Sequence, residues 1–490
     1  MPGGPVIKSA TESKRDVKLI GMTVGLAFLL ASLILPAPAG MEPAAWHVAG
    51  VALLMATWWM TEAIPIPATS LVPLVLFPLL SVGAIREAAS AYADPIIFLF
   101  MGGFVLGIGM QRWSLHVRIG LNTLAFVGTQ PAKLVAGFLL ATALPSMWVS
   151  NTATAIMMIP VAASVLTLLD RRADLDEISR HNLGIALVLA VAYGATIGGL
   201  ATIVGTPTTA VLVGFMDREY GVEIGFAQWM VLGLPLSAIM LLGCWRVLIW
   251  VYPVGAGGEA EAKKVLIDEI AKLGPITTAE KRFAIVFAMT AFAWMTRPLI
   301  DNYIVGLSDT GIAMGAALSL FFIPSGTENN RRLLIWDDLQ NLPWGVLLLF
   351  GGGLSLAAAI SSSGLAGWVG TVMQSLDTWP VLLVVAVATI GMTFLTELTS
   401  NTASATAILP LAAAVAIGLG FDPLLIVVPL TLAASLAFML PVATPPNAIA
   451  FSSGRITIAQ MVRAGFWLNL FGIGVVLTLN YAITSWLFVP

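Results

Sequence analysis

The chain has 490 residues, of which 58% are apolar and only 10% carry a formal charge. Soluble domains carry about 25% charged residues, so this composition excludes a soluble enzyme, a nucleic-acid binder and a disordered chain. It indicates an all-α polytopic membrane protein, in which every helix satisfies its own backbone hydrogen bonds. The net charge of −3 gives no reason to expect a polyanionic partner, and the single cysteine, Cys244, excludes an intramolecular disulfide.

Apolar segments suited to a membrane span, which needs about 20 residues, recur along the chain. The first is predicted to be a retained span and not a cleaved signal peptide, because its apolar run, Leu19 to Leu35, exceeds the usual 7–15-residue core. The polar stretch 255–282 is predicted to be an amphipathic connector at the membrane surface. The apolar ranges are 19–36, 46–83, 95–111, 134–169, 183–216, 228–252, 283–300, 307–323, 343–362, 380–419, 423–452 and 460–489.

The basic residues set the orientation, because cytoplasmic loops of membrane proteins carry an excess of Lys and Arg. Most of them fall on one side if the N-terminus is cytoplasmic and if 134–169 and 380–419 are re-entrant helical hairpins. This arrangement has about 11 transmembrane segments and an outside C-terminus. Its outer segments hold Glu87, Asp94, Asp217, Glu219, Glu223, Asp301 and Asp309. Its cytoplasmic segments hold Lys8, Lys14, Arg15, Lys18, Arg112, Arg118, Lys133, Arg171, Arg172, Arg180, Lys263, Lys264, Lys272, Lys281, Arg282, Arg331, Arg332, Arg455 and Arg463.

The sequence contains an internal repeat. Ser150-Asn151-Thr152-Ala153 recurs 250 residues later as Ser400-Asn401-Thr402-Ala403. Two further pairs follow in the same order: Phe100 to Gly103 with Phe350 to Gly353, and Gly205-Thr206-Pro207 with Ala443-Thr444-Pro445. The first hairpin enters from the cytoplasm and the second from outside, so the repeat is inverted, as in many secondary transporters.

The two Ser-Asn-Thr motifs interrupt apolar segments, as the tip of a helix–turn–helix hairpin would. Ser and Asn are favoured at helix N-caps, and the free N–H groups of the following helix can bind an anion. Side-chain and carbonyl oxygens at the same place can bind a hard cation. One motif could simply cap two helices, but its duplication at equivalent positions favours a binding site.

Two helix breaks accompany these motifs. The first is Gly198 to Pro207 and the second is Pro441 to Asn447, and unwound carbonyls at such breaks suit Na⁺. The carboxylates Glu62 and Glu397 lie beside apolar segments, and their roles as structural or functional groups stay open. The three histidines are scattered and no G-x-x-x-x-G-K-[ST] motif occurs, so neither a metal cluster nor ATP hydrolysis through a P-loop is expected.

The paired motifs, with Trp58 to Ala63, Thr396 to Ala403 and Ala443 to Asn447, resemble the divalent anion/sodium symporter family over about residues 18 to 490. The resemblance implies a homodimer in the cytoplasmic membrane, with a scaffold domain and a mobile transport domain in each protomer. It implies elevator-type, Na⁺-coupled symport of C4-dicarboxylates such as succinate, malate and fumarate. Na⁺ is then the co-transported ion, and no other cofactor is expected.

The resemblance also assigns site residues and domain boundaries. The substrate-binding residues are Asn151, Thr152, Ser400, Asn401, Thr402, Thr444 and Pro445. The sodium-binding residues are Ser150, Asn151, Gly199, Thr396, Thr399, Asn401 and Ala443. The expected organisation is a cytoplasmic tail (1–18), a first scaffold segment (19–127), a first transport segment (128–254, with hairpin 134–169 and broken helix 183–216), the connector (255–282), a second scaffold segment (283–376), and a second transport segment (377–490, with hairpin 380–419 and broken helix 423–452).

One departure from the family pattern bears on substrate choice and on the first sodium site. Family members usually have Gly-Thr-Pro-Pro-Asn in the first break, whereas here Thr208-Thr209 follows Pro207. The main alternative function is Na⁺-independent exchange of dicarboxylates or tricarboxylates by a member of the same family. A channel and a membrane-embedded enzyme are less well supported, because two half-spanning hairpins suit alternating access and no cluster of His and carboxylates occurs.

Overall fold

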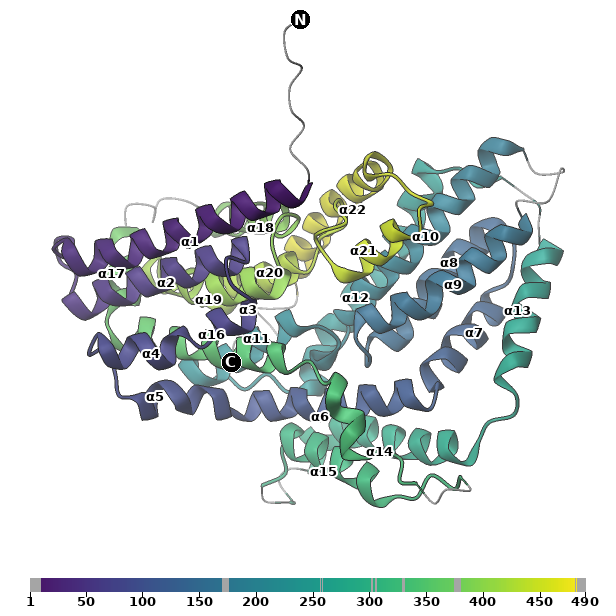
Figure 1. Cartoon of the computed structure of the whole chain (residues 1–490), viewed down its shortest axis with the longest axis horizontal. Helices are drawn as coiled ribbons and strands as arrows, with labels where there is room; N and C mark the ends of the chain where they lie inside the picture. Colours follow the sequence, from purple (N-terminus) through teal and green to yellow (C-terminus); the bar gives the residue numbers. More distant parts are fainter. Residues whose placement is uncertain are drawn as a thin grey trace, which may run out of the picture.

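The computed structural model describes residues 10–169, 176–255, 257, 259–300, 303–304, 306–327, 331–373, 380–480 and 482. The described residues form helices joined by loops, as expected from the sequence (Figure 1). Among them, nine helices are long and apolar enough to cross a membrane, and six shorter apolar helices accompany them. The charged residues Lys8, Arg171, Arg172 and Asp301, which entered the orientation prediction, lie outside the described residues.

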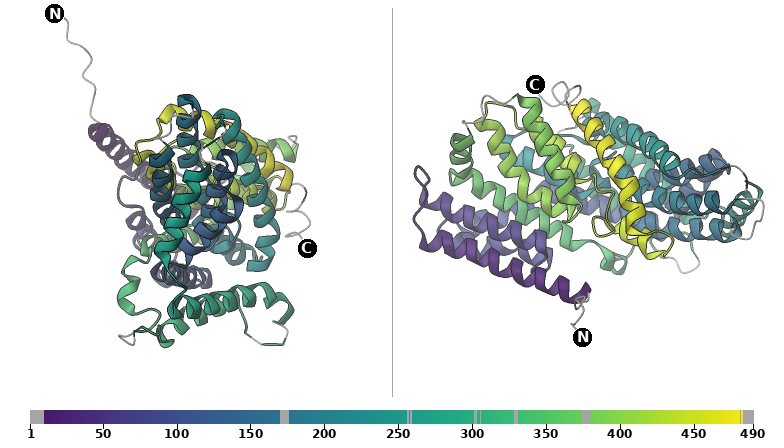
Figure 2. Two further views of the ribbon diagram at one scale, coloured as in Figure 1. Left: turned by 90° about the vertical axis from the view of Figure 1, so that its right-hand side faces the viewer. Right: turned by 90° about the horizontal axis from the view of Figure 1, so that it is seen from above.

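The first helices form one end of the molecule, where α1 packs along α2 (Figures 1 and 2). The apolar range 46–83 is not one span. Helix α2 ends at its C-cap residue Glu62, which adopts a left-handed conformation (φ 48°). Pro65 is the N-cap residue of the short helix α3, and a second short helix, α4, follows. The bounds are α1 (Ala10–Ile34), α2 (Pro43–Thr61), α3 (Ile66–Thr69), α4 (Val72–Leu79), α5 (Ile85–Ser90) and η1 (Ala91–Ala93).

The rest of the chain contains two series of seven helices in the same order. The first series is α6 (Pro95–Arg112), α7 (Leu115–Val127), α8 (Pro131–Ser146), α9 (Asn151–Leu169), α10 (Glu177–Gly199), α11 (Pro207–Tyr220) and α12 (Phe226–Val251), with η2 (Ile203–Gly205) before α11. The second is α16 (Trp344–Ser362), α17 (Leu365–Met373), α18 (Val381–Thr396), α19 (Asn401–Gly418), α20 (Leu424–Ala434), α21 (Pro445–Ser452) and α22 (Ile458–Leu479). Between them lie α13 (Glu259–Leu273), α14 (Thr278–Ile300), α15 (Asp309–Phe322) and η3 (Trp336–Asn341).

The repeated helices α7 and α17 were not expected from hydropathy, because both are too short to span a bilayer. Each follows a residue in the left-handed conformation, Ser114 (φ 56°) before α7 and Gly364 (φ 81°) before α17. These two residues are 250 positions apart, as are the Ser-Asn-Thr motifs. The repeat therefore extends to the backbone turn that ends α6 and α16.

The two series run in opposite directions. Arg112, at the end of α6, forms an ion pair with Asp338, just before α16, with Nη1 and Oδ1 2.8 Å apart. Farther along α16, Gly351 lies against the ring of Tyr92, which precedes α6. Helix α16 thus begins where α6 ends and runs back along it. Helix α9 contacts α21, and α19 contacts α11 in return, which is the reciprocity that a two-fold relation requires.

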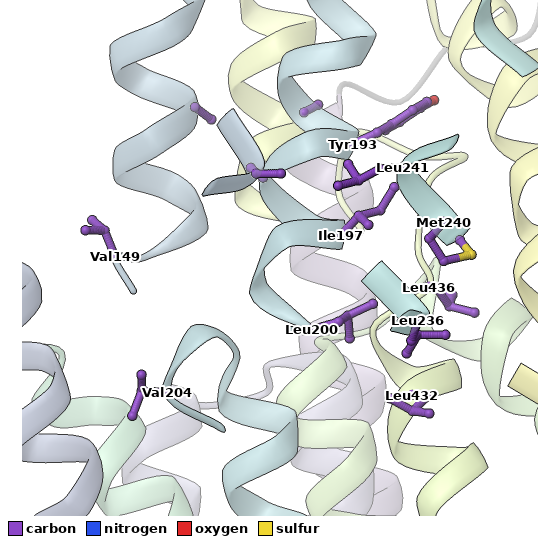
Figure 3. Packing of buried hydrophobic residues seen from close by; sticks show 14 of the residues in the cluster. Val149, Tyr193, Ile197, Leu200, Val204, Leu236, Met240, Leu241, Leu432 and Leu436 are labelled. Atoms are coloured by element: carbon purple, nitrogen blue, oxygen red, sulfur yellow. The ribbon is translucent and has the colours of Figure 1, made fainter. Parts of the chain in front are cut away.

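Helix α10 is at the centre of the fold. Every residue from Leu183 to Gly199 is buried, which explains why this segment is apolar on all sides. Figure 3 shows Leu200 just after its end, near Leu236 from α12, Leu432 from α20 and Leu436 from the segment that follows α20. By contrast, α1 and α14 are mostly exposed and carry large apolar side chains outward, as helices in contact with lipid do.

Candidate functional site

The tip of the first hairpin forms a cluster of oxygen atoms. Helix α8 ends at Ser146 and α9 begins at Asn151, and Ser150 caps α9 by accepting a hydrogen bond from the N–H of Ala153 at 3.3 Å. The hydroxyl of Ser146 lies 2.6 Å from Asn151 Oδ1 and 2.7 Å from the carbonyl oxygen of Ala195 on α10. A hydroxyl, a side-chain amide and a backbone carbonyl therefore meet where the hairpin touches the first broken helix.

The tip of the second hairpin repeats this arrangement. Helix α18 ends at Thr396 and α19 begins at Asn401, capped by Ser400. The hydroxyl of Thr396 lies 2.6 Å from Asn401 Oδ1 and 2.8 Å from the carbonyl oxygen of Ala434 at the end of α20. Thr399 adds a hydroxyl that lies 2.6 Å from the hydroxyl of Ser404.

In each cluster one hydroxyl lies within hydrogen-bond distance of two acceptor oxygens. The single hydroxyl proton of Ser146 or Thr396 can satisfy only one of two oxygens, so the other keeps a free lone pair. A small hard cation would satisfy all three oxygens together, because such ions bind carbonyl, amide and hydroxyl oxygens. Each cluster therefore presents oxygen atoms of the kinds that hard cations bind.

Gly199, which was predicted to bind sodium, lies close to Asn151 of the first cluster. A methyl group added to it would lie 2.8 Å from Asn151 Oδ1 and 2.9 Å from the carbonyl oxygen of Gly205. Only glycine fits this close approach of hairpin and broken helix. The hydroxyl of Thr202, inside the break, donates to the carbonyl of Met147 at 2.5 Å and accepts from the N–H of Gly205. The hydrogen bond from Thr202 to Met147 thus connects the first break to the hairpin tip.

The second break is organised by Glu397. Its carboxylate accepts hydrogen bonds from the N–H groups of Phe438, Met439 and Leu440 at 2.7–3.0 Å, and from Asn469 Nδ2 at 2.7 Å. These N–H groups have no helical partner, because α20 has ended and α21 has not begun. The buried Glu397 therefore holds the unwound segment in place. Glu62, the other open case, lies at the surface, where Lys18 is 3.9 Å away.

The remaining predicted residues lie around the two tips. Thr152, Thr402 and Asn401 are half-buried, as residues that line an accessible cavity would be. Thr444 is buried and caps α21 by accepting from the N–H of Asn447 at 3.3 Å, and Pro445 is exposed. Ala443 is buried in the second break.

Sequence reasoning missed three oxygen donors. Ser146 could have been found, because it lies 250 residues before Thr396, which was predicted to bind sodium. The carbonyls of Ala195 and Ala434 carried no such signal, because the residue type alanine does not indicate the direction of its backbone carbonyl. Within the described ranges no group of three or more His, Cys, Asp or Glu residues could hold a metal ion.

Comparison with known proteins identifies the family of this chain. The sequence profile described as the sodium:sulfate symporter transmembrane region matches residues 16–489. The sodium-dependent dicarboxylate transporter SdcS of Staphylococcus saprophyticus is 40% identical over 486 residues, covering 97% of this chain and 93% of that protein. The SdcS of Staphylococcus aureus strain USA300 is 42% identical over 480 residues, covering 95% and 91%.

Two solved structures are similar in fold. The YdaH transporter of Alcanivorax borkumensis matches with a TM-score of 0.57 at 14% identity, covering 97% of this chain and 100% of that one. MtrF of Neisseria gonorrhoeae, described as illuminating a class of antimetabolite efflux pumps, matches with a TM-score of 0.57 at 11% identity, covering 96% and 95%. The resemblance inferred from the paired motifs is confirmed: the chain belongs to the sodium:sulfate symporter family, whose members are membrane transporters and not enzymes.

Proposed function

We propose that this protein is a secondary active transporter that couples the uptake of C4-dicarboxylates, such as succinate, malate and fumarate, to Na⁺. The observation that carries the proposal is the matched pair of oxygen clusters, each with one hydroxyl between two acceptors. Two relatives at about 40% identity bear the name sodium-dependent dicarboxylate transporter. Each alignment covers almost the whole of this chain and almost the whole of the relative.

The substrate would bind between the two tips. Helices α9 and α19 both begin there, and their N-terminal N–H groups and macrodipoles favour an anion. Thr152 and Thr402 supply hydroxyl donors one residue into each helix. No Lys or Arg occurs in either Ser-Asn-Thr motif, so Na⁺ at the adjacent clusters would offset the two negative charges. Substrate affinity would then depend on Na⁺, which is the requirement for symport.

Movement would follow the elevator scheme, with hairpins and broken helices carried as one body. Helix α7 belongs with this body in our proposal, although it precedes the expected boundary at residue 128. A methyl group added to Gly137 of α8 would lie 2.7 Å from the side chain of Leu124 of α7, so the two helices pack without a gap. The left-handed turn at Ser114 would then join the moving body to α6.

We place the protein in the plasma membrane with a cytoplasmic N-terminus and an outside C-terminus, and we propose a homodimer. Two sets of ion pairs support the orientation. Arg112 and Arg118, predicted to be cytoplasmic, pair with Asp338 and Glu280 at one end of α6. Asp94, predicted to be outside, pairs with Arg218 at the other end of α6. The mass of the detergent-solubilised protein by light scattering would test the dimer.

Radiolabelled succinate uptake into proteoliposomes tests the function. Symport requires uptake into empty vesicles that depends on an inward Na⁺ gradient, with malate and fumarate as competitors. Uptake only into vesicles preloaded with unlabelled succinate, unaffected by Na⁺, would overturn the proposal in favour of exchange. Large unitary currents in planar bilayers would indicate a channel instead.

A further inference from the structure

A chain of three buried hydroxyl groups joins the two halves of the protein beside the second oxygen cluster. The hydroxyls of Thr206 and Thr208 are 3.2 Å apart, and that of Thr208 lies 2.6 Å from the hydroxyl of Ser435. Thr206 and Thr208 lie at the start of α11 in the first half, and Ser435 directly follows α20 in the second. Thr208 and Ser435 are 1% and 2% exposed, so no water competes for this hydrogen bond.

This contact has no counterpart on the other side of the pseudo-two-fold axis. The residue equivalent to Thr208 is Pro446, which has no polar side-chain atom. The residue equivalent to Ser435 is Thr196, whose hydroxyl donates to Ala192 within its own helix at 3.3 Å. The two oxygen clusters are therefore alike, but the hydroxyl contact between Thr208 and Ser435 occurs only beside the second one among the described residues.

The contact affects the second oxygen cluster because Ser435 is covalently joined to one of its members, Ala434. The peptide bond between Ala434 and Ser435 carries the carbonyl oxygen that completes the second cluster, 2.8 Å from the hydroxyl of Thr396. Helix α20 ends at this peptide bond, so no further helical turn fixes the direction of its carbonyl. The hydrogen bond between the hydroxyls of Ser435 and Thr208 fixes one side of that peptide group. Thr208 in turn contacts Thr206, the N-cap residue of α11.

We propose that Thr208 and Ser435 are positioning residues that couple the first helix break to the second cation site. They orient the Ala434 carbonyl for Na⁺, and the occupied site in turn holds Thr206 and the start of α11 in the substrate-binding arrangement. This inference rests on the proposed function, because it assumes that the second cluster binds Na⁺ during transport. It assigns the coupling to a contact that the duplicated motifs do not contain.

Removal of the hydroxyl without change of shape tests the proposal. In Thr208→Val, the Na⁺ concentration for half-maximal succinate uptake should rise by about three- to tenfold, as expected for the loss of one hydrogen bond. Ser435→Ala should produce the same rise, and the double variant should not exceed either single one, because both remove a single contact. Thr208→Ser keeps the hydroxyl and should restore the parent value.

Thr431→Val is the matched control. Thr431 is buried in α20, one turn before Ser435, and its hydroxyl donates to the carbonyl of Val427 in the same helix at 2.8 Å. This variant should leave Na⁺ activation as in the parent protein. A second readout avoids transport altogether: the rise in melting temperature that NaCl causes in detergent, relative to choline chloride, should shrink in Thr208→Val and Ser435→Ala but not in Thr431→Val.

The possible results separate the two proposals. If uptake by the parent protein does not depend on Na⁺, the proposed function fails and this inference fails with it. If the parent depends on Na⁺ and Thr208→Val keeps the parent Na⁺ activation, only the inference is overturned. Additive effects in the double variant, or an equal shift in Thr431→Val, would likewise overturn it, because the effect would then not come from the Thr208–Ser435 contact.

Discussion

Phe100 and Phe350, which occupy the same position in the two halves of the sequence, contact each other edge to face, with ring centroids 5.3 Å apart. Residues related by a two-fold axis can meet each other only on that axis. The pseudo-two-fold axis of the fold therefore passes between these two rings, and α6 and α16 cross at this point. A sequence repeat thus becomes a direct contact between its two copies.

The two rings should contribute equally to stability. We expect Phe100→Ala and Phe350→Ala each to cost about 3–5 kcal/mol of folding free energy, with a coupling energy of about 0.5–1.5 kcal/mol in the double variant. Melting of the purified protein in detergent measures this. Phe292→Ala serves as the control, because Phe292 is 64% exposed in the protomer. Strictly additive losses would show that the rings do not stabilise each other.

The oxygen clusters should control Na⁺ dependence. Asn151→Ala and Asn401→Ala should each abolish transport while leaving folded protein in the membrane, since each removes an oxygen ligand at a hairpin tip. Ser146→Ala, which removes the hydroxyl between two acceptors, should raise the Na⁺ concentration for half-maximal uptake by about tenfold or more. Uptake assays at varied Na⁺ check both. Ser164→Ala, at an exposed position on α9, is the control. Normal uptake by either asparagine variant would refute the site.

Glu397 should be required for structure. In Glu397→Gln one acceptor oxygen becomes an NH₂ group, which would face the backbone N–H groups of Phe438 to Leu440. We expect a loss of about 2–4 kcal/mol, larger than that of Asn469→Ala, which removes one of the four donors. Thermal unfolding of the two variants tests this ranking. Glu62→Gln, on the surface, should melt as the parent does; an unchanged melting temperature in Glu397→Gln would mean that the segment is held by other contacts.

The left-handed turns at Ser114 and Gly364 should respond in opposite ways to substitution. Gly364→Ala should destabilise the protein by about 1–2 kcal/mol through its backbone alone, since nothing lies within 4 Å of the added methyl group. Ser114→Gly relieves the same strain but increases the entropy of the unfolded chain. It should therefore raise the free energy of unfolding by only about 0–1 kcal/mol. Melting curves of both variants decide the matter. A clear destabilisation by Ser114→Gly would show that the Ser114 side chain itself stabilises the turn.

The sequence by itself determined the class of protein and the position of its motifs. Long apolar segments with few charges predict membrane-spanning helices, and motifs that recur in the same order about 250 residues apart predict two similar substructures. Polar triplets in apolar segments marked the hairpin tips, because such residues cap helices and interrupt spans. The first helix break, predicted at Gly198 to Pro207, agrees with the gap between α10 and α11. The second was predicted at Pro441 to Asn447, but α20 already ends at Ala434 and α21 begins at Pro445, so the unwound segment starts earlier than the prolines indicated.

The tertiary structure alone decided which atoms meet. The carbonyls of Ala195 and Ala434 enter the clusters because a broken helix from elsewhere in each half reaches the hairpin tip, and backbone oxygens leave no mark in a sequence. The contacts of Glu397 and Thr208 were hidden in the same way. Glu397 accepts from Leu440, more than 40 residues away, and Thr208 contacts Ser435, more than 200 residues away. Hydropathy and spacing are local properties, whereas a binding site is built by packing between distant segments.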